Sequence, residues 1–173
     1  MDTQQIFVLQ FGLSLVAWGV VATWTFAPRL ARMPRATALF WLALPHAFRH
    51  IGMVFVVPGV VAHELPEGFA VPAAYGDLTT GVLALVAVLL LRAKWSGAIG
   101  FVWLFNIVGT LDLANALRHV DVVSGFGSAW YIPTMLVPLL LVTHVMMFAR
   151  LVRGAGEGGW HEELDESVVK HAA

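Results

Sequence analysis

The sequence has no cysteine and little charge. Only 12% of its 173 residues are Asp, Glu, Lys or Arg. Without cysteine the chain can form no disulfide bond and no thiolate metal site, and thiol catalysis is excluded. A formal net charge of −1 provides no large basic surface, so a nucleic-acid partner is not expected.

What remains is strongly apolar. Hydrophobic residues make up 59% of the chain, whereas soluble domains contain about 45–50% apolar and about 25% charged residues. This composition predicts an integral membrane protein. The first five residues lack the positive region of a cleaved signal peptide, and the apolar run after them is long enough to stay in the membrane as a span.

Five runs are long enough to cross a hydrocarbon core about 30 Å thick, which takes about 20 apolar residues in a helix. They cover residues 6–27, 38–62, 71–91, 95–117 and 129–152. We therefore predict an all-α, polytopic bundle of five transmembrane helices within residues 1–153. Residues 154–173 are rich in glycine and then in acidic residues, and we predict a flexible acidic cytoplasmic tail.

The basic residues between the spans predict the orientation. They are Arg29, Arg32 and Arg35 in the first loop, Arg92 and Lys94 in the third, and Arg150 and Arg153 at the end of the last span. Only Arg118 falls on the opposite side. Since cytoplasmic loops are enriched in Lys and Arg, the N-terminus should lie outside and the C-terminus inside. The predicted location is the cell membrane, of the bacterial inner-membrane type.

Three charged residues lie inside the spans, away from the basic residues at the cytoplasmic ends: Arg49, Asp77 and Asp112. A charge at membrane depth costs roughly 2.5–3.5 kcal/mol, so it is usually paired, hydrated or part of a site. With the predicted orientation Arg49 lies near mid-membrane and both carboxylates lie in the outer third. The sequence therefore predicts an ion pair of Arg49 with Asp112 or Asp77.

Histidines and amides extend this polar group. His46, Arg49, His50 and Met53 are spaced i, i+3, i+4 and i+7, which forms one face of an α-helix and should point into the bundle. The candidate ligand-binding residues are His46, Arg49, His50, Asp77, Asn106 and Asp112. The alternative is an ion pair that only fixes the packing of the helices.

His46 and His144 lie on different spans at a similar predicted depth. Two such histidines could be the axial ligands of a b-type haem, or they could be packed histidines with satisfied hydrogen bonds. His46 and His50 with one carboxylate are also compatible with a divalent metal, although no metal site is assigned. No HExxH, GxSxG or P-loop motif occurs, so enzymatic activity is not indicated.

The sequence thus favours a membrane protein that binds a small ligand or solute in an outward-open His/Arg/Asp pocket, within a transport or sensing system. The alternatives are an electron-transfer subunit with haem between His46 and His144, and a structural or accessory subunit. Besides the lipid bilayer, we expect a second copy of the chain or a partner membrane subunit. Five spans without an internal repeat are few for an independent transporter.

Overall fold

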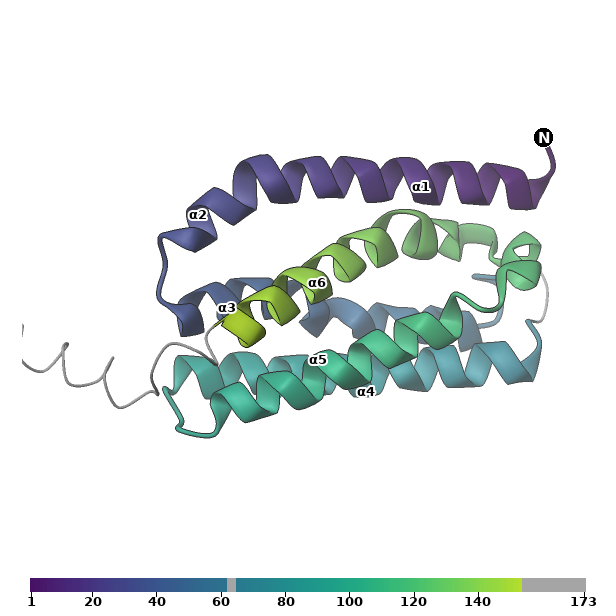
Figure 1. The fold of residues 1–173 in the computed structure, drawn as a ribbon. Helices are drawn as coiled ribbons and strands as arrows, with labels where there is room; N and C mark the ends of the chain where they lie inside the picture. The colour runs from purple at the N-terminus through teal and green to yellow at the C-terminus, as the bar shows by residue number, and fades with distance from the viewer. Residues whose placement is uncertain (62–64, 154–173) are drawn as a thin grey trace, which may run out of the picture.

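The computed structural model describes residues 1–61 and 65–153, and all regular secondary structure in these ranges is helical (Figure 1). Five helices are long and apolar enough to cross a membrane: Thr3–Ala31, Arg35–Val56, Glu67–Arg92, Ala98–Ala116 and Gly127–Arg153. The predicted all-α class and the presence of five helices of membrane-spanning length and composition are confirmed. The orientation in the membrane stays a prediction, and the predicted tail lies outside the described residues.

The first span runs along one side of the bundle. It consists of α1 (Thr3–Val21), a π-helical turn (Ala22–Phe26) and α2 (Ala27–Ala31). Asp2 begins α1 with a capping box, since its carboxylate accepts from the backbone of Gln5. Only 11% of the residues in the most apolar window of this span are buried. Its outer side therefore offers apolar side chains to lipid.

The second span changes its helical type halfway. It begins as α3 (Arg35–Ala43) and continues as 13 residues of 3₁₀ helix from Leu44 to Val56, although 3₁₀ runs longer than about four residues are uncommon. The change comes just before Pro45, which has no backbone N–H to donate. The span ends at Val56 rather than at residue 62 as predicted. Val57 is extended (ψ 114°) because the α conformation is disfavoured before Pro58.

Three further helices complete the bundle: α4 (Glu67–Arg92), α5 (Ala98–Ala116) and α6 (Val137–Arg153). The 3₁₀ segment packs along α4 so closely that a Cβ at Gly81 would lie 3.1 Å from the backbone nitrogen of His50. Two short 3₁₀ turns and a π-helical turn (Ile132–Leu136) lead from α5 into α6.

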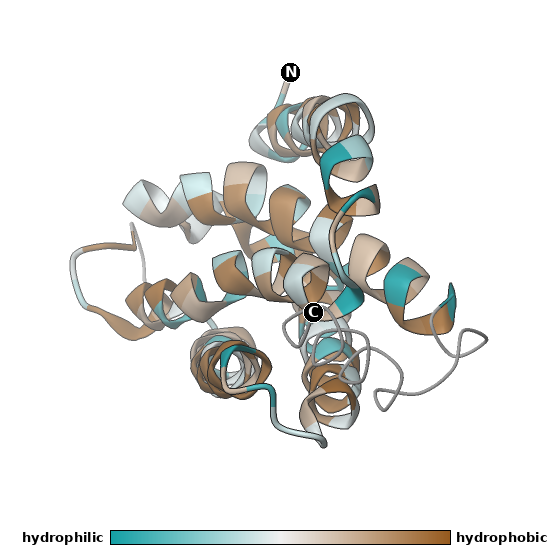
Figure 2. Cartoon of the chain, turned by 90° about the vertical axis from the view of Figure 1, so that its left-hand side faces the viewer, coloured by the Kyte–Doolittle hydropathy of each residue, from teal (hydrophilic) through white to brown (hydrophobic). Residues whose placement is uncertain are grey.

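Apolar side chains fill both ends of the bundle, and polar ones lie between them. One apolar cluster joins the start of α3 to the end of α4 and includes Leu39 and Val88. The other surrounds Phe55 and Phe126 at the end where the N-terminus lies (Figure 1). The helices are also apolar around much of their circumference (Figure 2), as expected when lipid surrounds them.

Candidate functional site

Arg49 is buried at the centre of the bundle and joins two carboxylates from different helices. Its Nε donates to Oδ1 of Asp77 on α4 at 2.7 Å, and its Nη2 lies 2.6 Å from the same oxygen. Nη2 also pairs with Oδ2 of Asp112 on α5. Nη1 donates to the backbone carbonyl of Gly109 at 3.1 Å. The sequence predicted one of the two ion pairs, and the structure contains both.

The 3₁₀ geometry decides which side chains of the second span face this centre. With three residues per turn, every third residue shares a side, and the buried residues of the segment are His46, Arg49, Gly52 and Phe55. His50 is exposed, with its Nδ1 3.0 Å from the carbonyl oxygen of Ala47. The prediction that His50 faces the pocket was wrong, because it assumed the α-helical period.

The carboxylates of Asp77 and Asp112 each lie against a glycine, in space that a Cβ would occupy. A Cβ added to Gly52 would overlap the carboxylate of Asp77, and one added to Gly76 would overlap that of Asp112. Neither glycine was among the predicted site residues. Their positions in the sequence could have indicated them, since Gly52 lies one 3₁₀ turn after Arg49 and Gly76 directly precedes Asp77.

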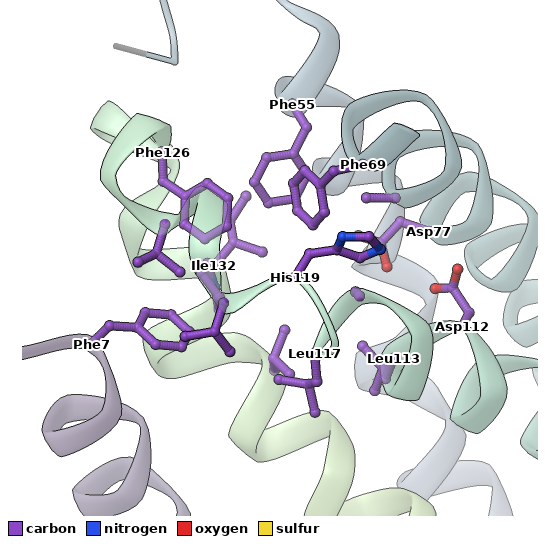
Figure 3. A pocket seen from close by; sticks show the side chains of 16 residues that line it. Phe7, Phe55, Phe69, Asp77, Asp112, Leu113, Leu117, His119, Phe126 and Ile132 are labelled. Atoms are coloured by element: carbon purple, nitrogen blue, oxygen red, sulfur yellow. The ribbon is translucent and has the colours of Figure 1, made fainter. Parts of the chain in front are cut away.

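A small cavity opens beside the two carboxylates (Figure 3). It lies at the end of the bundle that holds the N-terminus, since Phe7 near the start of α1 lines it. Its volume of about 40 Å³ has room for about three water molecules. The carboxylates lie on one side of it and the rings of Phe7 and Phe126 on the opposite side. Its polar lining includes His119, which shares a helical face with Asp112 in the sequence but was not among the predicted ligand residues.

The charges of the cluster do not cancel. One guanidinium (+1) faces two carboxylates (−2), which leaves a formal charge of −1. The Arg49 side chain is 0% exposed, whereas those of Asp77 and Asp112 are 14% and 17% exposed. The surplus negative charge is therefore on the side that faces the cavity.

A second polar group, formed by His46, Asn106, Thr143 and His144, lies deeper in the bundle. His46 Nε2 is 2.9 Å from Thr143 Oγ1, and His144 Nδ1 is 2.6 Å from Asn106 Oδ1. All four residues are buried, and none of them lines the cavity. His46 and Asn106, predicted as ligand residues, thus belong to this inner group, of which the sequence had not predicted Thr143 as a member.

The histidine pair does not fit the alternative of a haem between His46 and His144. An iron bound by both rings would lie between them, with the porphyrin plane separating the two. The centroids of the His46 and His144 rings are 4.2 Å apart and the rings are tilted by 57°, so the imidazoles contact each other and leave no space for a porphyrin. Within residues 1–61 and 65–153, no group of three or more His, Asp or Glu side chains could hold a metal ion.

The five apolar helices and the charged cluster at their centre define a multi-pass membrane protein. Residues 6–152 match the model of a family described as a domain of unknown function, DUF8737, and the chain belongs to this family. No curated protein and no solved structure matches the chain.

Proposed function

We propose that the protein binds a small ligand with a positively charged group in the cavity beside Asp77 and Asp112, as part of a membrane transport or sensing system. The observation that carries this proposal is the unequal charge of the cluster. Arg49 faces two carboxylates, and both are partly open to the cavity.

An ion pair that only fixed helix packing would need a single carboxylate. Charges at membrane depth are costly unless they are paired, and removing a charge from water costs several kcal/mol even after relaxation. A second carboxylate adds this cost with no second cation in the cluster. A ligand cation in the cavity would balance the charge, whereas a purely structural or accessory role leaves the second carboxylate unexplained.

The other walls of the cavity favour the same class of ligand. The rings of Phe55, Phe69 and Phe126 line it, and aromatic faces attract cations. A volume of about 40 Å³ limits the inserted group to a few heavy atoms, such as the head of a primary alkylammonium ion. In this arrangement the carboxylates bind the charge, and Arg49 holds them in position.

The predicted orientation places this cavity at the outer face. The basic residues Arg35 and Arg153 mark the opposite end of the bundle, where Arg35 Nη2 donates to the carbonyl of Leu151 near the end of α6. We propose that this end is cytoplasmic, which follows the enrichment of cytoplasmic loops in Lys and Arg. A second copy of the chain or a partner subunit remains part of the proposal, as does a bacterial-type inner membrane.

The test is thermal unfolding of the detergent-purified protein with methylammonium chloride as the probe. A ligand that binds only the folded state raises the unfolding temperature in a saturable manner. Sodium chloride at the same ionic strength controls for salt, and methanol controls for the uncharged shape. We expect a shift with methylammonium that neither control produces.

Two variants locate the binding. Asp112→Asn removes the surplus charge from the cavity and should abolish the shift. Asp121→Asn changes an exposed carboxylate outside the cavity and should leave the shift intact. An equal response to methylammonium and sodium, or an unchanged shift in Asp112→Asn, would overturn the proposal.

A further inference from the structure

Three buried polar atoms near the middle of the bundle have no hydrogen-bond partner among the described residues. They are His46 Nδ1, Thr80 Oγ1 and His144 Nε2. Their residues are at most 1% exposed and come from the 3₁₀ segment, α4 and α6. Buried polar atoms in proteins nearly always have a partner, either protein or ordered water.

The bonds of the opposite ring nitrogen show what His46 offers. Thr143 Oγ1 donates its single proton within its own helix, to the carbonyl of Leu139 or Leu140 at 3.0 Å. With its proton directed at either carbonyl, Thr143 Oγ1 accepts from His46 Nε2, which lies 2.9 Å away, and we assign the ring proton to this nitrogen. In a neutral imidazole the unpartnered Nδ1 is then a lone-pair acceptor.

The same argument applies to His144. The amide of Asn106 donates through Nδ2 to the backbone carbonyl of His144 at 3.4 Å, which directs its oxygen at His144 Nδ1. The 2.6 Å contact between Asn106 Oδ1 and His144 Nδ1 requires a proton on the ring nitrogen. The unpartnered Nε2 of His144 is thus an acceptor as well.

The side chains that carry these three atoms lie next to one another. The rings of His46 and His144 are in contact, with centroids 4.2 Å apart. A Cβ at Gly109 would lie 3.0 Å from His144 Nε2 and 2.7 Å from Thr80 Cγ2. The backbone of Gly109 therefore lies next to these side chains. The carbonyl of Gly109 accepts a hydrogen bond from Arg49, which lies between them and the outer cavity.

We infer that His46, His144 and Thr80 form an internal water site. Two imidazole acceptors call for a ligand with two donors, and the Thr80 hydroxyl can donate to it or accept from it. Water has this set of donors and acceptors, and it commonly satisfies buried polar groups that lack protein partners. One or two molecules can bridge side chains in contact.

The site does not depend on the proposed ligand. With this site, polar groups continue without interruption from the outer cavity, past Arg49, to His46 and His144. Beyond the pair, toward the other end of the bundle, the side chains are apolar, with Val102 and Phe105 both 0% exposed. The hydrated part of the interior thus ends at His46 and His144.

The test is solid-state NMR of the full chain in lipid bilayers, with ¹⁵N and ¹³C labels in its seven histidines. The ¹⁵N shifts distinguish the tautomers, and we expect the proton on Nε2 of His46 and on Nδ1 of His144. Both rings should show cross-peaks to water protons. The exposed His50 identifies the signal of a ring on the outside of the bundle.

Thr80→Val keeps the shape of the side chain but removes the hydroxyl, and it should reduce the cross-peak between water and His144 at least twofold. Thr79→Val, at an exposed neighbouring position, should leave it unchanged. The opposite tautomers, or no water cross-peak at either ring, would overturn the inference. If Thr80→Val does not fold, the wild-type spectrum alone decides between these outcomes.

Discussion

Gly52 lies against the carboxylate of Asp77, with no space between them for another carbon atom. A Cβ at position 52 would overlap the carboxylate carbon and one of its oxygens. The glycine thus lets the 3₁₀ segment approach α4 at the level of the ion pair, one turn beyond Arg49.

Gly52→Ala should therefore displace the carboxylate of Asp77 from Arg49. Overpacking of a tight site costs typically about 1–3 kcal/mol, and we expect a loss of folding free energy in this range. The measurement is equilibrium unfolding of the purified protein in detergent micelles.

The matched control is Gly100→Ala, since a Cβ at this exposed helical position meets nothing within 4 Å. Alanine is a better helix former than glycine by up to about 1 kcal/mol, so this variant should be as stable as the wild type or slightly more stable. Equal losses in the two variants would contradict the close contact of Gly52 with Asp77.

A second prediction concerns the pairing itself. Arg49→Met leaves two carboxylates without their cation, and breaking a buried pair in this way costs about 3–5 kcal/mol. Adding Asp77→Asn and Asp112→Asn to Arg49→Met should recover part of this loss. Strictly additive effects on the free energy of unfolding would exclude the coupling. Arg118→Met removes an exposed arginine and should change stability by less than about 0.5 kcal/mol.

The sequence predicted the class and the centre of this fold for a simple physical reason. A chain that crosses a lipid bilayer must form long apolar helices. Charged residues inside such helices are rare because they are costly, so each one can be identified in the sequence. Arg49, Asp77 and Asp112 could be recognised without knowing any contact, and their pairing followed from depth. Both ion pairs formed because α4 packs against the 3₁₀ segment and α5 packs against α4, so that the long Arg49 side chain reaches a carboxylate on each helix.

What could not be predicted depends on backbone geometry. The spacing of His46 and His50 indicates a shared face only if the helix has 3.6 residues per turn. The amino-acid composition of the segment did not predict 13 residues of 3₁₀ helix. The contact between His46 and His144 also depends on how far apart the helices pack. Similar depth made a haem conceivable, and only the 4.2 Å between the rings showed that it does not fit.

The orientation gives a third prediction. Green fluorescent protein fused after Ala173 should fluoresce, and alkaline phosphatase at the same point should be inactive, because the basic end of the bundle is expected to be cytoplasmic. Alkaline phosphatase fused after Ser124, between α5 and α6, should be active. Phosphatase activity at Ala173 would show that the orientation is the opposite of the predicted one, with the carboxylate cavity on the cytoplasmic side.

The last prediction tests the 3₁₀ helix directly. Because the chain has no cysteine, single cysteines from position 46 to position 56, with the ion-pair positions 49 and 52 left unchanged, can each carry a spin label in lipid bilayers. Collisions with dissolved oxygen are frequent where a label faces lipid. We expect minima at positions 46 and 55, which are three turns of 3₁₀ helix apart, as in the burial pattern of the segment.

Positions 50 and 53 decide between the two helices. An α-helix would bury both along with positions 46 and 49, since i, i+3, i+4 and i+7 share a face. In the 3₁₀ helix position 50 is exposed and position 53 is only half-buried, whereas position 55 is buried, although an α-helix would place it on the opposite side from position 46. Higher oxygen collision rates at position 50 than at position 55 would show the 3₁₀ period. The reverse order would restore His50 to the interior beside Arg49 and would remove the basis for placing Gly52 against Asp77.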